Sequence, residues 1–204
     1  MTTVGNRRER KKHAVRRRIL STAIQLFTRH GLDGVTIDEI AAAADVGKGT
    51  IYNYFAAKED IVVAFMAGLE AQLACKIARF TPGTRPVHRV LAHYILLHFR
   101  LKAPYHGFTR VFLAQMFTNT PRFLPYMVEM QKYIDPPLQS LFQALKDGGW
   151  LRADIDVPEL VMSFKTMHFG LTALWAVEGP PFKQTIQTVR QQMRLFSEGI
   201  ARKA

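Results

Sequence analysis

Apolar residues recur at intervals of three and four positions along most of this 204-residue chain. Directly after residue 18, for example, Ile19, Ala23 and Phe27 would lie on one face of a helix that Gly31 would end. No segment shows a sustained alternation of apolar and polar residues, which is the pattern of a half-buried strand. The spacing therefore predicts an all-α fold.

Prolines and glycines mark the ends of the expected helices. We predict about nine helices, over residues 19–30, 37–44, 48–55, 58–80, 85–102, 105–117, 123–147, 157–177 and 182–201. Pro136 and Pro137 fall inside the seventh of these segments, where each removes a backbone donor. We therefore expect a kink there, or two helices end to end.

Positive charge is concentrated at the N-terminus. The chain has 28 Lys and Arg residues against 16 Asp and Glu, a formal net charge of +12, and residues 1–18 alone hold eight basic residues and one acid. We interpret residues 1–18 as a basic arm, which is either a solvated tail or a segment that neutralises the phosphates of a nucleic acid. If the arm binds nucleic acid, the residues that contact DNA include Arg16, Arg17 and Arg18.

Composition excludes several other classes of protein. With 48% hydrophobic residues the chain can bury a core, and its single cysteine, Cys75, excludes an intrachain disulfide framework. The longest apolar run covers residues 61–69, roughly half of the ~20 residues that cross a bilayer. We therefore expect a cytoplasmic protein without a membrane partner.

The familiar catalytic and cofactor-binding patterns are also missing. The chain contains no G-x-S-x-G, no H-E-x-x-H and no G-x-G-x-x-G motif. His88, His93 and His98 are five residues apart, a spacing that turns each by about 140° around a helix, so they cannot share one metal ion. We therefore expect neither an enzyme nor a bound cofactor or metal.

Two short helices joined by a tight turn are expected early in the chain. Thr36 and Glu39 have the spacing of a capping box, and the four alanines at 41–44 allow a second helix to approach closely. The second helix then combines side chains able to reach phosphates and base edges with two inward anchors, Ile51 and Phe55. This arrangement predicts a helix-turn-helix braced by the preceding helix.

The stretch over residues 31–61, GLDGVTIDEIAAAADVGKGTIYNYFAAKEDI, resembles the DNA-binding signature of TetR/AcrR-type transcriptional regulators. The matching residues are Gly31, Thr36, Ile40, Ala41, Ala44, Val46, Gly49, Thr50, Ile51, Tyr52, Tyr54, Phe55, Lys58 and Glu59. Two positions depart from the pattern. The usual Gly of the turn is Asp45, which tolerates a left-handed backbone, and the usual Ser or Thr at the next helix start is Gly47.

The resemblance implies a DNA-binding domain over residues 19–57 and a ligand-binding and dimerisation domain over residues 58–204. It also implies a set of residues that face the major groove and its phosphates: Thr36, Lys48, Gly49, Thr50, Tyr52, Asn53, Tyr54 and Lys58. Among them Asn53 is the best candidate for reading a base, because an Asn amide can pair bidentately with adenine. Lys48 could instead reach guanine.

The last two predicted helices carry apolar seams at three- and four-residue spacing, which is typical of helix bundles. Such seams either close the core of one chain or join two chains. The resemblance implies a homodimer and a palindromic DNA operator, with half-sites about one helical turn apart or wider. The interface residues would be Leu160, Phe164, Met167, Leu171, Leu174, Ile186, Val189, Met193 and Phe196.

The middle of the chain is rich in aromatic residues and methionine, which indicate either plain core or an apolar chamber. The resemblance implies a chamber for a small-molecule effector, and the shortage of acids favours a neutral or anionic lipophilic molecule. His93 or His168 could orient its polar end. The predicted lining is Phe65, Leu69, His93, Tyr94, Leu97, Phe112, Met116, Phe117, Phe142, Phe164 and His168.

The sequence thus favours a sequence-specific DNA-binding regulator, most simply a repressor that an effector releases from its operator. An activator has the same fold, so the sign of regulation stays open. The alternative is a basic amphipathic protein that binds membrane surfaces, or nucleic acid without sequence preference, through residues 7–30.

Overall fold

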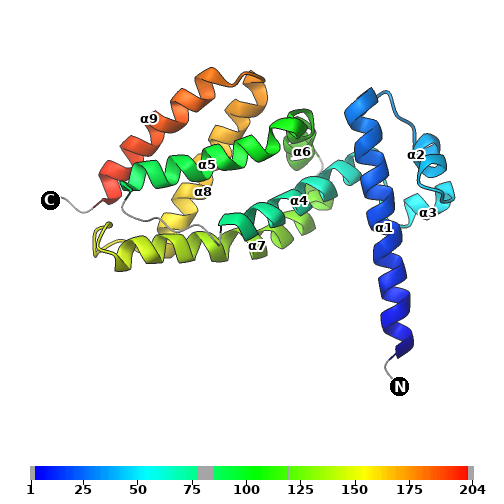
Figure 1. The fold of residues 1–204 in the computed structure, drawn as a ribbon, viewed down its shortest axis with the longest axis horizontal. Helices are drawn as coiled ribbons and strands as arrows, with labels where there is room; N and C mark the ends of the chain where they lie inside the picture. The colour runs from blue at the N-terminus through cyan, green and yellow to red at the C-terminus, as the bar shows by residue number, and fades with distance from the viewer. Residues whose placement is uncertain (1–2, 78–84, 119, 202–204) are drawn as a thin grey trace. The chain divides into compact units, whose positions relative to one another are not determined.

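The computed structural model describes residues 3–77, 85–118 and 120–201 (Figure 1). Within these ranges the chain forms nine α-helices and one short 3-10 helix, which confirms the predicted all-α fold. They are α1 (Thr3–His30), α2 (Ile37–Ala43), α3 (Lys48–Tyr52), α4 (Lys58–Ile77), α5 (Val87–Lys102), η1 (Ala103–Tyr105), α6 (His106–Thr118), α7 (Thr120–Asp147), α8 (Val157–Glu178) and α9 (Lys183–Ile200). An isolated antiparallel bridge pairs Leu151 with Ala201.

The chain divides into two compact units, Met1–Met66 and Ala67–Ala204, and the boundary falls inside α4. The first unit holds α1, α2, α3 and the start of α4. The second unit holds the rest of α4 and the helices from α5 to α9. The division of functions between residues 19–57 and 58–204 stays a prediction.

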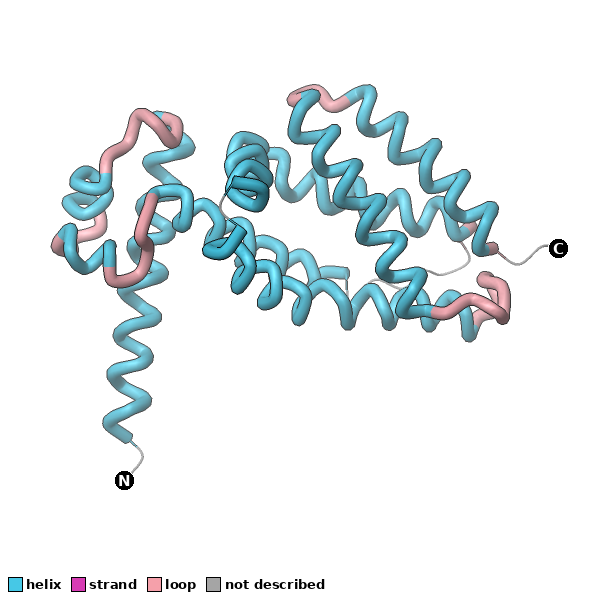
Figure 2. Tube along the Cα trace, turned by 180° about the vertical axis from the view of Figure 1, so that it is seen from behind, coloured by secondary structure: helices cyan, strands magenta, loops and turns pink. Residues whose placement is uncertain are grey.

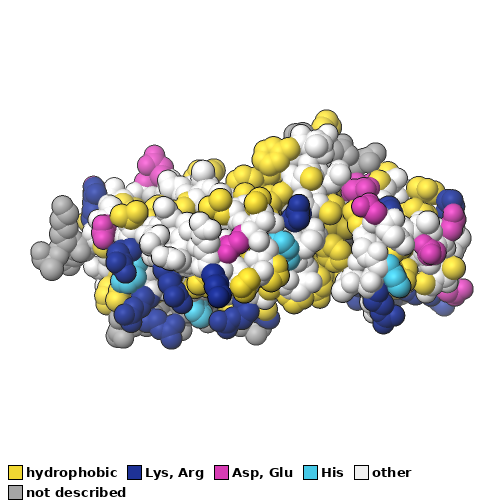
Figure 3. Space-filling model, turned by 90° about the horizontal axis from the view of Figure 1, so that it is seen from above, with side chains coloured by type: hydrophobic (Ala, Val, Ile, Leu, Met, Phe, Trp, Pro, Cys, Tyr) yellow, Lys and Arg dark blue, Asp and Glu magenta, His cyan; other side chains and the backbone are white. Residues whose placement is uncertain are grey.

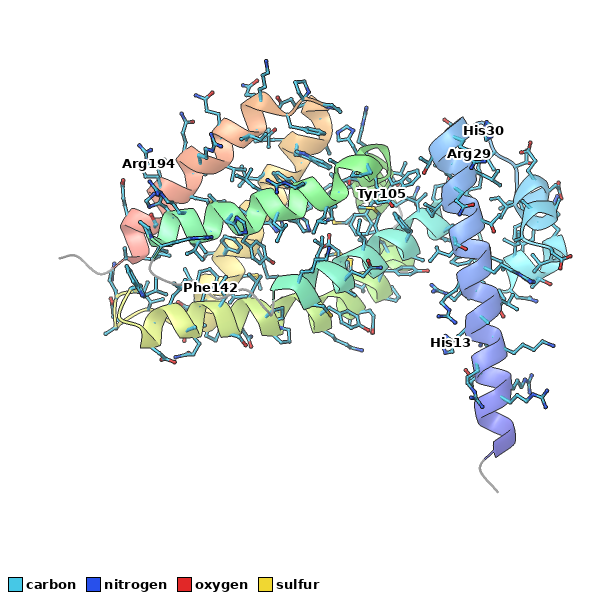
Figure 4. All side chains as sticks on the ribbon, in the orientation of Figure 1. His13, Arg29, His30, Tyr105, Phe142 and Arg194 are labelled. Carbon is cyan, nitrogen blue, oxygen red and sulfur yellow. The ribbon has the colours of Figure 1, made fainter. Side chains whose placement is uncertain are left out.

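Helix α1 begins at Thr3, so the segment expected as a separate basic arm is the N-terminal part of a 28-residue helix. The cause is local, because Arg, Lys, Glu and Ala favour a helix and neither Gly nor Pro interrupts residues 6–30. The side chains of residues 7–14 are exposed, so helix propensity rather than a core holds this part. His13, labelled in Figure 4, projects from it.

Helix α7 runs without interruption through Pro125, Pro136 and Pro137. The expectation of two helices end to end at the proline pair is therefore wrong. The prolines remove backbone hydrogen bonds, but Leu138 and Phe142 directly after them are fully buried. Burial of such side chains offsets the loss, since each contributes about 1.5–3 kcal/mol.

The core of the first unit lies where α1 packs on α2 and α2 packs on α3. Helix α1 contributes Ile19 and Phe27, and the two short helices and the turn after them contribute Ile40, Ile51 and Phe55. Each of these five side chains is at most 2% exposed. They lie on the faces that the three- and four-residue spacing predicts.

The core of the second unit is formed mainly by α5, α7, α8 and α9 (Figure 2). Helix α5 packs along α9, and α7 packs along α8. Phe164 on α8 lies at the centre, with the rings of Tyr94 and Phe142 edge-on at 5.4 Å. This packing buries one whole face of α8.

By length and composition alone, α8 is the one helix of the described residues that could cross a membrane. Its buried residues include Leu160, Phe164, Leu171 and Trp175, which pack in the core of the second unit. Packing within the chain therefore accounts for the apolar residues on one side of α8.

We expect Phe164→Ala to lower the free energy of unfolding by about 3–5 kcal/mol, because removal of a fully buried ring leaves a cavity. Phe117→Ala is the matched control. Its ring is 71% exposed, so the change should stay within about 0.5 kcal/mol. Urea denaturation followed by circular dichroism measures both, and equal losses would contradict this description of the core.

Candidate nucleic-acid interface and internal cavity

Helix α2 begins with the capping box that the sequence predicts at Thr36. The Thr36 hydroxyl accepts a hydrogen bond from the Glu39 backbone N–H at 3.2 Å, and the Glu39 carboxylate accepts one from the Thr36 backbone N–H at 2.7 Å. The hydrogen bonds from the backbone and the side chain of Thr36 lower the pKa of the Glu39 carboxyl. The exchange satisfies donors at the helix start and fixes the direction of α2.

The turn between α2 and α3 depends on Asp45. Its φ of 49° lies in the left-handed region, where Asp is better tolerated than most residues, as expected from the sequence. The guanidinium of Arg18 donates to the Asp45 carbonyl oxygen at 3.1 Å. Arg18, expected at DNA phosphates, therefore ties α1 to this turn.

Helix α3 turns an apolar side inward and a polar side outward. Ile51 and Phe55 are 0% and 1% exposed, whereas Tyr52 is 49% exposed. The helix ends at Tyr52 rather than at Phe55, and Asn53 caps it. The other exposed residues of this face are Lys48, Gly49 and Asn53, and the half-buried ones are Thr50 and Tyr54.

Lys48 pairs with Asp38 of the preceding helix, with its ammonium 2.8 Å from the carboxylate. The hydrogen bond to Asp38 raises the pKa of Lys48. Both side chains are more than half exposed, so water screens the pair. A phosphate or a base could therefore replace Asp38 as the partner of Lys48.

Lys58 has a structural role that the sequence did not predict. Its ammonium donates to the carbonyl oxygens of Leu32 and Val35, at 2.8 and 2.9 Å. Lys58 thereby holds the loop after α1 to the start of α4. These two bonds use two of its three N–H donors, and its contact with the DNA backbone stays a prediction.

Sequence reasoning missed Asp60. Its carboxylate accepts hydrogen bonds from the backbone N–H groups of Ala56 and Ala57, both at 3.0 Å, and the residue is 7% exposed. Asp60 therefore closes the turn that follows α3. An acid in the first turn of a helix was the available signal.

The basic residues of α1 differ in their surroundings. The guanidinium carbon of Arg16 lies 5.2 Å from the centre of the Phe55 ring, so Arg16 packs on the core of the first unit. Arg17 is exposed. The exposed basic residues nearer the N-terminus are Arg7, Arg8, Arg10, Lys11 and Lys12.

The second unit contains a cavity of about 360 Å³, with walls from the second half of α4 and from α5, α6, α7 and α8. Most of its lining residues are apolar. Four of the residues predicted to line a chamber do so: Tyr94, Phe112, Met116 and His168. That they bind a ligand stays a prediction.

The other seven predicted lining residues do not belong to the wall of this cavity. Phe142 and Phe164 are fully buried in the core, Phe117 is 71% exposed, and His93 is exposed on α5. The remaining three predicted residues that do not line the cavity are Phe65, Leu69 and Leu97. Helical spacing identifies a buried face, but it does not tell a face against a cavity from a face against another helix.

The cavity wall also holds a buried polar cluster, of which only His168 was predicted. The Glu70 carboxylate lies 2.8 Å from Nε2 of His98 and forms an ion pair with Lys102. The other ring nitrogen of His98, Nδ1, lies 3.0 Å from Nε2 of His168. Glu70, His98 and Lys102 are at most 8% exposed.

Burial and neighbouring charges set the protonation of this cluster. Burial acts to raise the pKa of the Glu70 carboxyl, but the contacts with His98 and Lys102 outweigh it and hold the pKa well below its usual range. Burial lowers the pKa of both His98 and His168. Near neutral pH, Glu70 is therefore ionised and both imidazoles are neutral.

Most of the residues expected at a dimer interface pack inside their own chain. Those that are buried are Leu160, Phe164, Leu171, Val189 and Met193. Those that are half-buried are Met167, Ile186 and Phe196. The five buried residues belong to the core of one chain, where α8 and α9 pack against α5 and α7. An interface role for the half-buried residues and for the exposed Leu174 stays a prediction.

The opposite side of α8 keeps large apolar side chains at the surface. Phe169, Leu174 and Val177 are 40%, 54% and 82% exposed, and Met162 is 60% exposed. Leu195 adds one on α9, at 62%. Hydrophobic side chains reach the surface at several places on the face drawn in Figure 3. Exposed apolar residues gathered on one helix mark an interaction surface.

Residues 19–65 match the family model described as bacterial regulatory proteins, tetR family. The match covers α2 and α3 together with the parts of α1 and α4 that flank them.

Curated relatives extend the similarity along the chain. The HTH-type transcriptional regulator RutR of Escherichia coli K12 is 25% identical over 201 residues, which are 95% of this chain and 94% of RutR. The HTH-type transcriptional repressor KstR2 of Mycobacterium tuberculosis is 27% identical over 177 residues, which are 85% of this chain and 86% of KstR2.

Among solved structures, the Thermus thermophilus FadR, a TetR-family transcriptional repressor in complex with lauroyl-CoA, has a TM-score of 0.74. It is 24% identical, over 93% of this chain and 97% of FadR. At this identity the likeness shows a shared fold.

We expect Lys58→Ala to lower the stability of the first unit by about 1–3 kcal/mol, because two backbone carbonyls lose a charged donor. Lys48→Ala is the matched control, and it should leave stability unchanged because its ion pair is exposed. Thermal denaturation of both variants measures the difference. Indistinguishable melting temperatures would show that Lys58 does not hold the loop.

Proposed function

We propose that this chain, a TetR-type transcriptional regulator, is a ligand-responsive repressor that acts in the cytoplasm. As a homodimer it binds a palindromic operator in duplex DNA, and a small lipophilic effector releases it. The observation that carries the proposal is the helix-turn-helix of the first unit, which falls within the stretch that matches the tetR family model.

Helix α3 has the properties that a recognition helix needs. Ile51 and Phe55 anchor it, so its outward side keeps a fixed orientation. Asn53 and Lys48 on that side carry the amide and ammonium groups that pair with base edges in the major groove. A Cβ atom built at Gly49 would have no neighbouring atom within 4 Å, so this position is open on its outer side. Because Gly49 carries no side chain, its backbone can come close to the duplex there.

The N-terminal part of α1 supplies attraction to phosphates that does not depend on sequence. Because these residues are helical, their charged side chains have defined positions along a helix instead of belonging to an unstructured tail. Neutralised phosphates release counterions, so the affinity for DNA should fall steeply as salt rises. Of the three arginines expected there, Arg17 and Arg18 are exposed and Arg16 is half-buried. Arg16 and Arg18 also hold α1 against the rest of the first unit.

The exposed apolar side chains of α8 support a dimer. A second copy of the chain would cover Phe169 and Val177 and remove them from water. Two-fold symmetry then places the two α3 helices in equivalent positions, and a palindromic operator offers each one the same half-site. The dimer surface is thus proposed on the outer side of α8 rather than on its buried seam.

The cavity of the second unit supports an effector. Its walls are mostly apolar, and FadR, which shares the fold, is described in complex with lauroyl-CoA. Helix α4 starts at Lys58 in the first unit and carries Glu70 in the cavity wall, so it is the natural route of coupling. A ligand that favours a conformation unable to bind DNA must weaken operator binding reciprocally.

Selection of bound duplexes from a random pool, with the full chain, tests the proposal. We expect an inverted repeat whose half-sites are about one helical turn apart or wider. A reporter gene behind the selected sequence then distinguishes a repressor from an activator. Indifference to base order, together with sedimentation on anionic vesicles, would favour the membrane-surface alternative instead.

We expect Asn53→Ala to reduce discrimination between the selected operator and single-base variants by roughly 10- to 100-fold at one position of each half-site, because a bidentate base contact is lost. Gln25→Ala, an exposed amide on α1, is the control and should leave discrimination unchanged. Fluorescence anisotropy with wild-type and mutated duplexes measures both. An unchanged specificity profile in Asn53→Ala would remove this residue from base readout.

We expect Val177→Asp to convert the dimer into a monomer, because a carboxylate would replace an apolar contact at the proposed interface. Val128→Asp is the matched control, since Val128 is 50% exposed on α7, outside the proposed surface. Sedimentation velocity at micromolar concentration gives the mass of each. A monomeric wild-type chain, or a dimeric Val177→Asp variant, would rule out this interface.

A further inference from the structure

One buried hydroxyl in the cavity wall lacks any partner in the described parts of the chain. Thr109 on α6 is 1% exposed, and its hydroxyl makes no hydrogen bond there. A buried hydroxyl without a partner lowers stability, so its presence in a cavity wall indicates a ligand that supplies the missing bond.

The charged residues of the wall, in contrast, already have partners within the chain. Glu70 is paired with Lys102, and the Lys165 ammonium lies 2.6 Å from the Asp135 carboxylate. A charged ligand would have to break one of these pairs or stay uncompensated among apolar side chains. Either choice is costly, because a buried charge without a partner loses its hydration.

The Glu70 carboxylate also fixes the direction of the hydrogen bonds through both histidines. An ionised carboxylate only accepts, so Nε2 of His98 donates to Glu70. In a neutral ring the other nitrogen, Nδ1, is then an acceptor, and Nε2 of His168 donates to it. Burial, which lowers the pKa of both rings, keeps them neutral.

This chain of hydrogen bonds ends at Nδ1 of His168, which must be an acceptor. Within the described residues no donor reaches that nitrogen, while His168 itself belongs to the cavity wall. The wall therefore holds one acceptor on His168, and it also contains Thr109, whose unpartnered hydroxyl can both donate and accept.

We infer that the cavity binds a neutral, largely apolar molecule with a hydroxyl group, which donates to Nδ1 of His168 and accepts from the hydroxyl of Thr109. A hydroxyl is the smallest group that offers both functions at one atom. The inference rests on the proposed function, because it names the chemical class of the effector.

Other head groups satisfy this wall less well. A carboxylate cannot donate a hydrogen bond to the acceptor Nδ1 of His168. Its negative charge would also lie close to the cluster that already contains the ionised Glu70. An ammonium could donate to His168, but no free acid in the wall balances its charge. A thioester carbonyl could accept from Thr109 but has no proton for His168.

The remaining wall suits a flexible hydrocarbon portion. Its volume of about 360 Å³ lies within the usual range of small-molecule sites. Leu73, Phe112, Phe123 and Ile134 give it apolar surface, and the methionines Met127 and Met130 can adapt to the shape of a ligand.

Three probes with the same ten-carbon chain test the charge of the head group: 1-decanol, used below its solubility limit, and decanoate and decylammonium, each used below its critical micelle concentration. Calorimetric titration of the full chain at pH 7.5 should give one 1-decanol site per chain. Both charged probes should bind at least about tenfold more weakly. The absence of 1-decanol binding, or decanoate binding as tight as that of 1-decanol, would overturn the inference.

Thr109→Val and His168→Phe test the two contacts. Thr109→Val keeps the size of the side chain and removes the unpaired hydroxyl, so the melting temperature should stay equal or rise while affinity for 1-decanol falls about three- to tenfold. His168→Phe should lower the affinity similarly. His93→Phe, on the exposed side of α5, is the control and should leave it unchanged.

Unchanged 1-decanol affinity in Thr109→Val would contradict the inference even where His168→Phe fails to fold. The titrations contain no DNA, so they separate this inference from the proposed function. Failure of the full chain to select any duplex would contradict the proposed function and leave the cavity measurement standing. Failure of 1-decanol to bind would contradict the inference about the cavity and leave the proposed function standing.

Discussion

Helix α3 has five residues, too few for a helix that is stable by itself, so its existence depends on the burial of Ile51 and Phe55. Burial of two such side chains contributes about 3–6 kcal/mol, which exceeds what helix propensity could supply. Asp60 closes the turn after α3, and Arg18 holds the turn before it at Asp45. The outward residues of α3 thereby receive a fixed geometry from contacts that other residues make, and the exposed ion pair of Lys48 with Asp38 is their own addition.

Local chemistry made this region predictable. The capping box at Thr36 needs only residues three positions apart, and the turn needs a residue that tolerates a left-handed backbone, which Asp45 does. The start of α1 and the continuity of α7 were not predicted. In α1 helix propensity continues past the end of the core, and at Pro136 tertiary burial outweighs a local breaker.

The partner of each apolar face could not be predicted from spacing. Helix α8 is apolar on two sides, and spacing alone does not tell which one meets the chain's own core. Phe164, expected at a cavity and at an interface, is at the centre of the core, while Phe169 and Val177 stay exposed. The Glu70 cluster was missed because Glu70 is 28 and 32 residues from its two partners, a separation at which no sequence pattern links them.

A cluster such as that of Glu70, His98 and Lys102 is a poor way to stabilise a helical core. Each ion taken out of water loses several kcal/mol of hydration, and apolar side chains of the same volume would often hold the helices at least as well. The unpaired hydroxyl of Thr109 adds a further loss in the same wall. The residues that lose this free energy line a cavity and are not spread through the core. A ligand that completes the missing hydrogen bonds recovers part of the lost free energy. On the proposed function, a bound ligand would make the wall more stable, and this is the energetic difference that an effector needs in order to shift a protein between two conformations.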